Sequence, residues 1–297
     1  MEQNFEQRIQ ERQIRLQNVS DTNTEDIEYI LTELQEEHQH LVMMTANSIN
    51  GAEEGYYQQL IKQNENQRTM AETAIDALKE ALFALGGFTP EQAEAIREKE
   101  EKTDHYEDIL GSYLVKLSGR ELSEDDHDEV TKLLKLISDF ERISDHAVNI
   151  LESAEELKEK EITFTDAAGK ELRVLGDAVG EIIALSMQAF KEDDLEAAAK
   201  VESLEQVVDG LKEQMRTRHI LRLTQGGCTV DAGFVWSDLL TNLERVSDHC
   251  SNIAGCVIDM TTKKLNIHES LREFRNYSND YKENFEMYVE KYRLPSL

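Results

Sequence analysis

DFERISDHAVNI, at residues 139–150, occurs again as NLERVSDHCSNI at residues 242–253. The positions that are identical in the two copies are mostly polar: Glu, Arg, Ser, Asp, His and Asn, with one Ile. A repeat with a spacing of about a hundred residues indicates two copies of one structural unit. A hydrophobic core constrains its residues only loosely, to apolar side chains of suitable size. Faithful copying of charged residues therefore indicates a repeated site.

Each copy has the spacing of an amphipathic helix. Its apolar residues recur every three or four positions, as expected for one buried stripe. The Glu and the Asp of each copy lie four residues apart, so they project side by side from adjacent turns of a separate face. The stripe consists of Leu136, Phe140, Ile143, Ala147 and Ile150 in the first copy, and of Leu239, Leu243, Val246, Cys250, Ile253 and Val257 in the second.

Helical signals extend over almost the whole chain. Two prolines and few glycines favour long helices. Thr89-Pro90 and Ser123 are typical helix starts, and the glycine pairs at 86–87 and 226–227 are typical turns. We expect helices over residues of about 24–48, 54–85, 90–117, 124–160, 166–191, 194–224, 231–261 and 277–292.

The order of these helices predicts an all-α fold of two tandem three-helix bundles. The helices of each bundle are expected to be antiparallel, because the connecting loops are too short for parallel neighbours. We expect an N-terminal helical extension over residues 1–52, a first bundle over 53–160, a second over 161–262 and a C-terminal helical tail over 263–297.

The charge of the chain restricts its partners. Its 297 residues include 61 acidic and 32 basic side chains, a formal net charge of −29. Nucleic-acid binding needs a cationic face, so this balance argues against it. It argues equally against docking on anionic lipid and favours the attraction of metal cations.

The cysteines and the hydropathy predict a cytoplasmic protein. Cys228, Cys250 and Cys256 are odd in number and have no CxxC spacing, which favours free thiols in a reducing compartment. No apolar run approaches the roughly 20 residues of a membrane span. The segment from Met1 to Arg15 is too charged for a signal peptide.

A second acid pair lies on the helix that precedes each copy of the repeated segment. In both units the midpoint between the two pairs falls in the turn that joins the two helices. An antiparallel hairpin folded at that turn brings the pairs to the same height, so four carboxylates converge in each unit. The residues of these expected sites are Glu100, Asp104, Glu141 and Asp145 in the first unit, and Glu205, Asp209, Glu244 and Asp248 in the second.

Four carboxylates at one level repel one another. They must point into water, share protons, pair with arginines or bind cations. Arg142 and Arg245 adjoin the acids in sequence and point about a quarter-turn away, so they compensate the charge incompletely. Oxygen ligands in this number suit Mg, Mn, Fe or Ca rather than a thiolate-type zinc site. We expect metal binding at two equivalent sites; the alternative is a set of solvated surface acids, which are common in so acidic a chain.

The other polar residues that are identical in the two copies have different expected roles. His146 and His249 lie about 100° round the helix from the aspartates, so we expect them to contact a neighbouring helix or to support the ligands. Ser144 and Ser247 are small enough to allow helices to approach closely.

In these residues the chain resembles the PhoU family of phosphate-uptake regulators. Each E-x-x-x-D pair is similar to a motif of that family. The segment at 243–253 and the C-terminal residues 288–294 resemble the PhoU-like domain of bacterial sodium/phosphate cotransporters. The resemblance implies two three-helix bundles and multinuclear clusters of divalent or trivalent metal ions (Fe, Mn, Mg or Zn), held by the eight acids named above.

The resemblance also implies a function. It points to a cytoplasmic, non-enzymatic regulator at the inner face of the cell membrane that restrains phosphate import or signalling. The implied partners are a phosphate transporter, of cotransporter or ABC type, and a sensor kinase; the sequence leaves open whether the chain forms a homodimer.

Two other interpretations stay open from the sequence. A ferritin-like di-iron carboxylate protein needs two Glu-x-x-His motifs on helices. Glu37 with His40 and Glu124 with His127 have that spacing, although neither recurs in the other unit. The third interpretation is a helical adaptor without metal.

Overall fold

The computed structural model describes residues 65–119, 122–262 and 279–296. Its helices follow the expected order: α4 (Glu65–Ala84), α5 (Pro90–Ser118), α6 (Glu124–Glu159), α7 (Asp166–Glu192), α8 (Leu195–Thr224), α9 (Val230–Thr262) and α11 (Asn279–Lys291). The described residues contain no strand. The helix expected at 24–48, the start of the one expected at 54–85, and the motif of Glu37 and His40 lie outside them.

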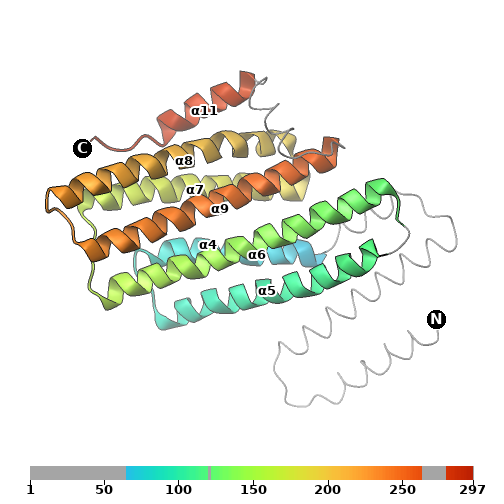
Figure 1. Cartoon of the computed structure of the whole chain (residues 1–297), viewed down its shortest axis with the longest axis horizontal. Helices are drawn as coiled ribbons and strands as arrows, with labels where there is room; N and C mark the ends of the chain where they lie inside the picture. The colour runs from blue at the N-terminus through green and yellow to red at the C-terminus, as the bar shows by residue number, and fades with distance from the viewer. Residues whose placement is uncertain (1–64, 120–121, 263–278, 297) are drawn as a thin grey trace, which may run out of the picture.

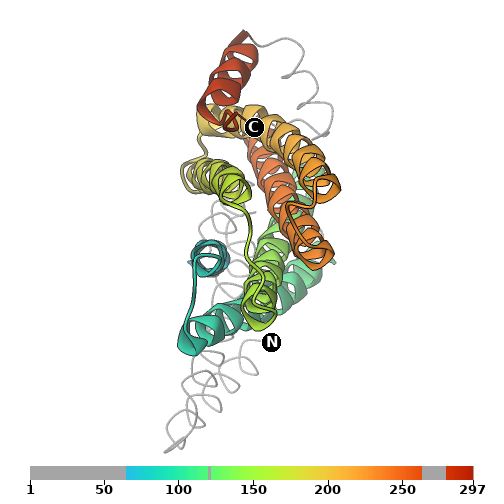
Figure 2. The ribbon, with the colours of Figure 1, turned by 90° about the vertical axis from the view of Figure 1, so that its left-hand side faces the viewer.

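The expected pair of three-helix bundles is confirmed. Helices α4, α5 and α6 pack on one another, as do α7, α8 and α9. The two bundles lie side by side with their long axes nearly parallel, and α6 lies against α9 between them (Figures 1 and 2). The helices that carry the two copies of the repeated segment therefore form the interface between the bundles. The exact domain boundaries, at 53, 161 and 263, stay predictions.

The helix ends follow from local chemistry. Thr89 forms a capping box with Gln92, and Pro90 occupies the first helical position. The hydroxyl of Ser123 accepts a hydrogen bond from the backbone N–H of Asp126 (3.1 Å). Gly226 follows α8 with φ +70°, a conformation that favours glycine. These caps fix the lengths of the hairpins and hence the heights at which the acid pairs meet.

The apolar stripes of the repeated segments are buried as expected. Phe140, Ile143 and Ala147 are at most 2% exposed, and so are their counterparts Leu243, Val246 and Cys250. One continuous core runs through both bundles. The ring of Phe140 on α6 meets that of Phe190 on α7 edge to face, with centroids 5.0 Å apart. Burial of such a side chain stabilises the fold by about 1.5–3 kcal/mol.

Helix α11 packs on the outside of the second bundle, against α8. Tyr288 is 2% exposed there. Glu181 of α7 binds Lys291 (2.7 Å) and accepts a hydrogen bond from the Tyr292 hydroxyl. These contacts tie the C-terminal helix to the bundle.

Two further expectations concern the environment of the chain. None of the helices in the described part is long and apolar enough to cross a membrane. The three cysteines are unpaired; Cys250 and Cys256 are buried, and burial raises the pKa of both thiols to about 12. Their thiolate fraction is therefore very small at neutral pH.

Candidate metal centres

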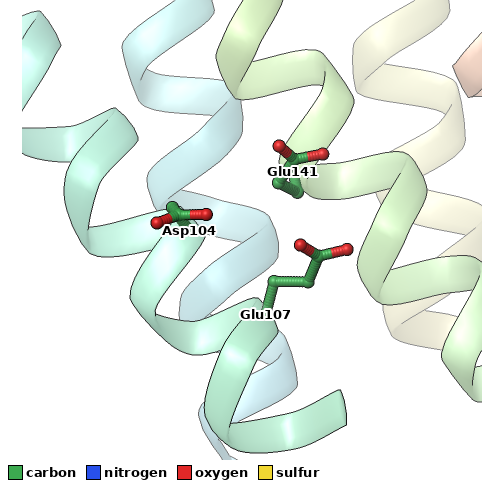
Figure 3. A group of neighbouring side chains, drawn as sticks. All are labelled: Asp104, Glu107 and Glu141. Carbon is green, nitrogen blue, oxygen red and sulfur yellow. The ribbon is translucent and has the colours of Figure 1, made fainter.

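The structure gathers the acids of the first bundle between α5 and α6. Oxygen atoms of Asp104, Glu107 and Glu141 all lie within 4.8 Å of one another. Figure 3 shows Asp104 and Glu107 on α5 with their carboxylates turned toward Glu141 on α6. Glu100 and Asp145 extend the group by one turn on each helix, and the charge of Asp145 contributes to a raised pKa of Glu100. We call these five residues cluster one.

The carboxylates of cluster one repel one another. Burial raises the pKa of Glu141 to about 7, and repulsion from Asp145 and Glu107 adds to the effect. Burial also raises the pKa of Glu100, with smaller contributions from Asp145 and Asp104. The pKa of Glu107 is raised by burial as well. Part of the cluster is therefore protonated near neutral pH unless a cation neutralises it.

The second bundle repeats the arrangement between α8 and α9. Oxygen atoms of Glu205, Asp209 and Asp248 lie within 4.8 Å of one another. Burial raises the pKa of Asp248, followed by repulsion from Glu244 and Asp209. We call Glu205, Asp209, Glu244 and Asp248 cluster two. All eight expected site residues thus fall into two clusters, one in each bundle.

The repeated residues occupy matching environments. The side chains of Glu141 and Glu244 are 16% and 17% exposed, and those of Asp145 and Asp248 are both 34% exposed. The adjoining arginine of each copy forms an ion pair with its aspartate. A guanidinium nitrogen of Arg142 lies 3.7 Å from a carboxylate oxygen of Asp145, and one of Arg245 lies 3.4 Å from Asp248. The helix geometry of the repeat is therefore preserved closely.

The clusters differ at one position that the sequence comparison missed. Glu107 of α5 belongs to cluster one. The residue at the same place in α8 is Lys212, whose ammonium lies 2.8 Å from a carboxylate oxygen of Glu244. Cluster one thus has five acids, whereas cluster two has four acids and an internal cation. The expected equivalence of the two sites does not extend to their charge.

A spacing rule would have found both residues. Glu107 lies three residues after Asp104, and Lys212 three residues after Asp209, so each shares a helix face with the predicted acids. A comparison that keeps only residues identical in both units misses this position, because the two units have opposite charges there.

The histidines of the repeat contact the other bundle rather than the clusters. His146 Nδ1 donates to Asn242 Oδ1 (2.9 Å), whose amide nitrogen is engaged with the carbonyl of Asp238. His249 Nδ1 donates to Asp139 Oδ1 (2.8 Å). Ser144 and Ser247 are at most 1% exposed, as expected at a close helix contact.

The donor sets fit hard metal ions. Each cluster offers only carboxylate oxygens, which suit Mg, Mn, Ca or Fe. Both are supplied by two helices whose spacing is fixed by a capped hairpin. The second expected di-iron motif lies in the first turn of α6, after the Ser123 cap, where His127 is exposed.

A family model described as the PhoU domain matches residues 68–154 and again residues 172–257. Each match covers one of the bundles and one of the clusters, and together they cover more than half of the chain. The chain belongs to the PhoU family. The resemblance noted in the repeated motifs is thereby confirmed.

Relatives and solved structures agree with this assignment. The phosphate-specific transport system accessory protein PhoU homolog 1 of Thermotoga maritima is 30% identical over 143 residues, which are 48% of this chain and 60% of that protein. A PhoU homolog of Pseudomonas putida is 23% identical over 202 residues, 62% of this chain and 77% of the relative.

Two crystal structures share the fold. PhoU from Pseudomonas aeruginosa superposes with a TM-score of 0.64 at 21% identity, covering 71% of this chain and all of that one. The phosphate transport system regulatory protein PhoU from Streptococcus pneumoniae gives a TM-score of 0.58 at 19% identity, covering 72% of this chain and 99% of that one.

Proposed function

We propose that this PhoU-family chain is a metal-binding, non-enzymatic accessory protein of a phosphate transport system. The observation that carries the metal proposal is the convergence of Asp104, Glu107 and Glu141 within 4.8 Å in cluster one, where the pKa of Glu141 is about 7. The names of the relatives, which are accessory proteins of phosphate-specific transport, support the assignment to phosphate transport.

The acids would hold divalent or trivalent ions, Fe, Mn, Mg or Zn, with room in the donor set for more than one ion in cluster one. Bound cations would neutralise the repelling carboxylates. They would also link α5 to α6 in the first bundle and α8 to α9 in the second. Metal binding would therefore stiffen both hairpins, and a cation bound only by the folded chain stabilises it by mass action.

The regulator would act by docking to a transporter at the cytoplasmic face of the membrane. Both the ABC and the cotransporter type are candidate partners, and a sensor kinase is a further one. The printed names of the relatives, accessory and regulatory proteins of phosphate transport systems, support a docking role. Docking would restrain phosphate uptake when phosphate is plentiful.

The test is a deletion strain of the native cell, complemented with variants. We expect deletion to raise phosphate uptake under phosphate excess and the natural gene to restore restraint. Complementation with Glu141→Gln/Asp145→Asn should fail, whereas the control Glu94→Gln/Glu98→Gln, an exposed acid pair with the same spacing on α5, should succeed. Unchanged uptake in the deletion strain would contradict the transport role. Full restraint by the cluster variant would contradict a role of the metal in it.

A further inference from the structure

Helix α11 has no counterpart after the first copy of the repeated segment. In the repeat α9 corresponds to α6, and α6 is followed after a short connection by α7. Residues 263–278 instead lead from α9 to α11, which packs on α8 at the outer edge of the molecule (Figure 2). Helix α11 is therefore an addition to the repeated unit, and the surface on which it packs can be compared with the same surface of the first bundle.

The face of α8 on which α11 packs is closed to water. The hydroxyl of Ser203 donates a hydrogen bond to the backbone carbonyl of Tyr281, near the start of α11 (3.2 Å). Val207 lies four residues after Ser203 and so shares its face. Ser203 is 0% exposed and Val207 is 5% exposed. We call Ser203, Val207 and the adjacent Glu181 of α7 the α11-binding face.

The equivalent face of the first bundle is charged. In the register that aligns the acid pairs of α5 and α8, Glu98 stands at the position of Ser203. Lys102 stands at the position of Val207. Both of these charged side chains are exposed. One unit thus has a water-facing surface at the place where the other unit has a surface that receives a helix.

Helix α11 meets this face with an aromatic stripe. Tyr281, Phe285, Tyr288 and Tyr292 recur at intervals of four, three and four residues, so they lie on one side of the helix. Tyr288 is 2% exposed and Tyr292 is 7% exposed. Beside the stripe, Glu181 accepts hydrogen bonds from Lys291 and Tyr292. An amphipathic helix laid on a receptive surface is a common mode of recognition between proteins.

The attachment of α11 is that of a helix which can be displaced. Its 13 residues are too few for a stable helix in water, so its helical form depends on packing. Its ion pair with Glu181 is open to water, because the side chain of Lys291 is 51% exposed, and such pairs contribute little. A displaced α11 would stay tethered to α9 through residues 263–278.

We propose that the α11-binding face is a docking site for an amphipathic helix of a partner protein, and that α11 occupies it in cis until the partner displaces it. The partner helix would carry aromatic residues at the spacing of the stripe and a basic residue for Glu181. Helix α11 defines this pattern, because it shows what the face accepts. The inference rests on the proposed docking role for the kind of partner, and it does not depend on metal binding.

The test uses a fluorescent peptide of residues 279–296, titrated with the full chain and followed by anisotropy. In the natural chain α11 competes at the high local concentration of a tethered segment, so the peptide should bind weakly. Tyr288→Ser weakens this competitor and leaves the α11-binding face intact. The peptide should therefore bind that variant at least roughly tenfold more tightly. Circular dichroism checks that the bundles stay folded.

Two further variants make the test specific. Met287→Ser changes a neighbouring side chain of α11 that is 48% exposed, and it should bind the peptide as weakly as the natural chain does. Ser203→Glu/Val207→Lys, added to Tyr288→Ser, gives α8 the residues that α5 has at these positions. Because α5 is helical with those residues, the bundle should fold, and the peptide should no longer bind.

Three outcomes of the titration would overturn the proposal. Equal binding by the natural chain and Tyr288→Ser would show that α11 does not block the face. No binding by Tyr288→Ser would show that the face accepts no helix from another molecule. A natural chain that forms a dimer, which Tyr288→Ser dissociates, would assign the face to α11 of a second copy.

Phosphate uptake in the complemented deletion strain tests the partner separately. Ser203→Glu/Val207→Lys should fail to restrain uptake while its metal content stays that of the natural chain. Full restraint by this variant, in a strain where deletion raises uptake, would contradict docking on this face and leave the proposed function standing. Unchanged uptake in the deletion strain would instead contradict the proposed function and, with it, a transport partner for this face.

Discussion

Asp139 and Asn242 occupy the same position of the repeated segment, and each accepts a hydrogen bond from the histidine of the other copy. The two histidines, His146 and His249, lie next to each other between the bundles with ring centroids 5.6 Å apart. The duplicated segment therefore does two things. One face of it supplies ligands to a cluster, and another face joins the two bundles through a reciprocal contact.

This contact predicts a difference between two substitutions of Asp139. The carboxylate accepts from His249 and also from the amide of Asn252 (3.1 Å). Asp139→Ala should lower the free energy of unfolding by about 1–3 kcal/mol, because the half-buried ring of His249 loses its acceptor and the exposed amide of Asn252 loses a weaker contact. Asp139→Asn copies the residue at position 242 and should cost less than half as much. Urea denaturation measures both, and equal losses would contradict the role of the acceptor.

The charge crowding in cluster one predicts a pH dependence of the metal-free chain. The pKa of Glu141 is about 7 in the folded chain against 4.5 for an unperturbed glutamate. The folded state thus binds this proton more tightly than the unfolded state does. Protonation of Glu141 therefore adds to the free energy of unfolding below pH 4.5, and this contribution is lost as the pH rises to about 7. With chelator present, the loss should be of the order of 1–2 kcal/mol, allowing for solvent screening.

Glu141→Gln should remove most of this dependence of stability on pH, because an amide does not titrate. Thermal denaturation in chelator at pH 5, 6 and 7 measures the effect, with Glu94→Gln as the control on an exposed acid of α5. A slope that persists in Glu141→Gln would show that other groups cause it.

The different charges of the two clusters predict different metal affinities. In cluster two the ammonium of Lys212 lies 2.8 Å from Glu244 and competes with a bound cation. Lys212→Met should therefore raise the affinity of cluster two about tenfold, a change of ~1.4 kcal/mol. Glu107→Gln should weaken cluster one. Calorimetric titration with Mn²⁺ measures both, and unchanged affinity in the Lys212 variant would contradict the competition.

The contacts of Glu181 predict how α11 is held. Its carboxylate is the shared acceptor for Lys291 and Tyr292. Glu181→Ala should loosen α11 from the second bundle, while the buried ring of Tyr288 keeps part of the contact. Hydrogen exchange in residues 279–291 should become at least several-fold faster with little change in α4–α6. Unchanged exchange would mean that apolar packing alone retains the helix.

Much of the fold could be predicted from the sequence because its signals are local. The caps at Thr89 and Ser123 and the glycine turns set the helix ends within a few residues, and the periodic stripes identified the buried faces. The height at which the acid pairs meet followed from the hairpin geometry. These features depend on short stretches of chain, where propensity and spacing decide the outcome.

The features that could not be predicted from the sequence depend on which helices pack against each other. The reciprocal contact of His146 and His249 arises from the packing of α6 on α9, which the spacing within one helix does not specify. The membership of Glu107 in cluster one was missed because the other copy has Lys212 there. A hollow between the end of α4 and the start of α5, lined by Phe83 and Phe88 among others, results from side-chain packing at the end of a bundle, for which the sequence has no signal.

Metal content is the most direct measurement of the proposed role of the clusters. The chain should be purified without chelator and its metals counted by mass spectrometry, beside Glu141→Gln/Asp145→Asn, Glu244→Gln/Asp248→Asn and the control Glu94→Gln/Glu98→Gln. We expect bound metal in the natural chain and the control, and a partial loss in each cluster variant, larger for cluster one because of its fifth acid. No bound metal in the natural chain after exposure to Mn²⁺, Mg²⁺ and Fe²⁺, or the same content in all four proteins, would contradict metal binding at these sites.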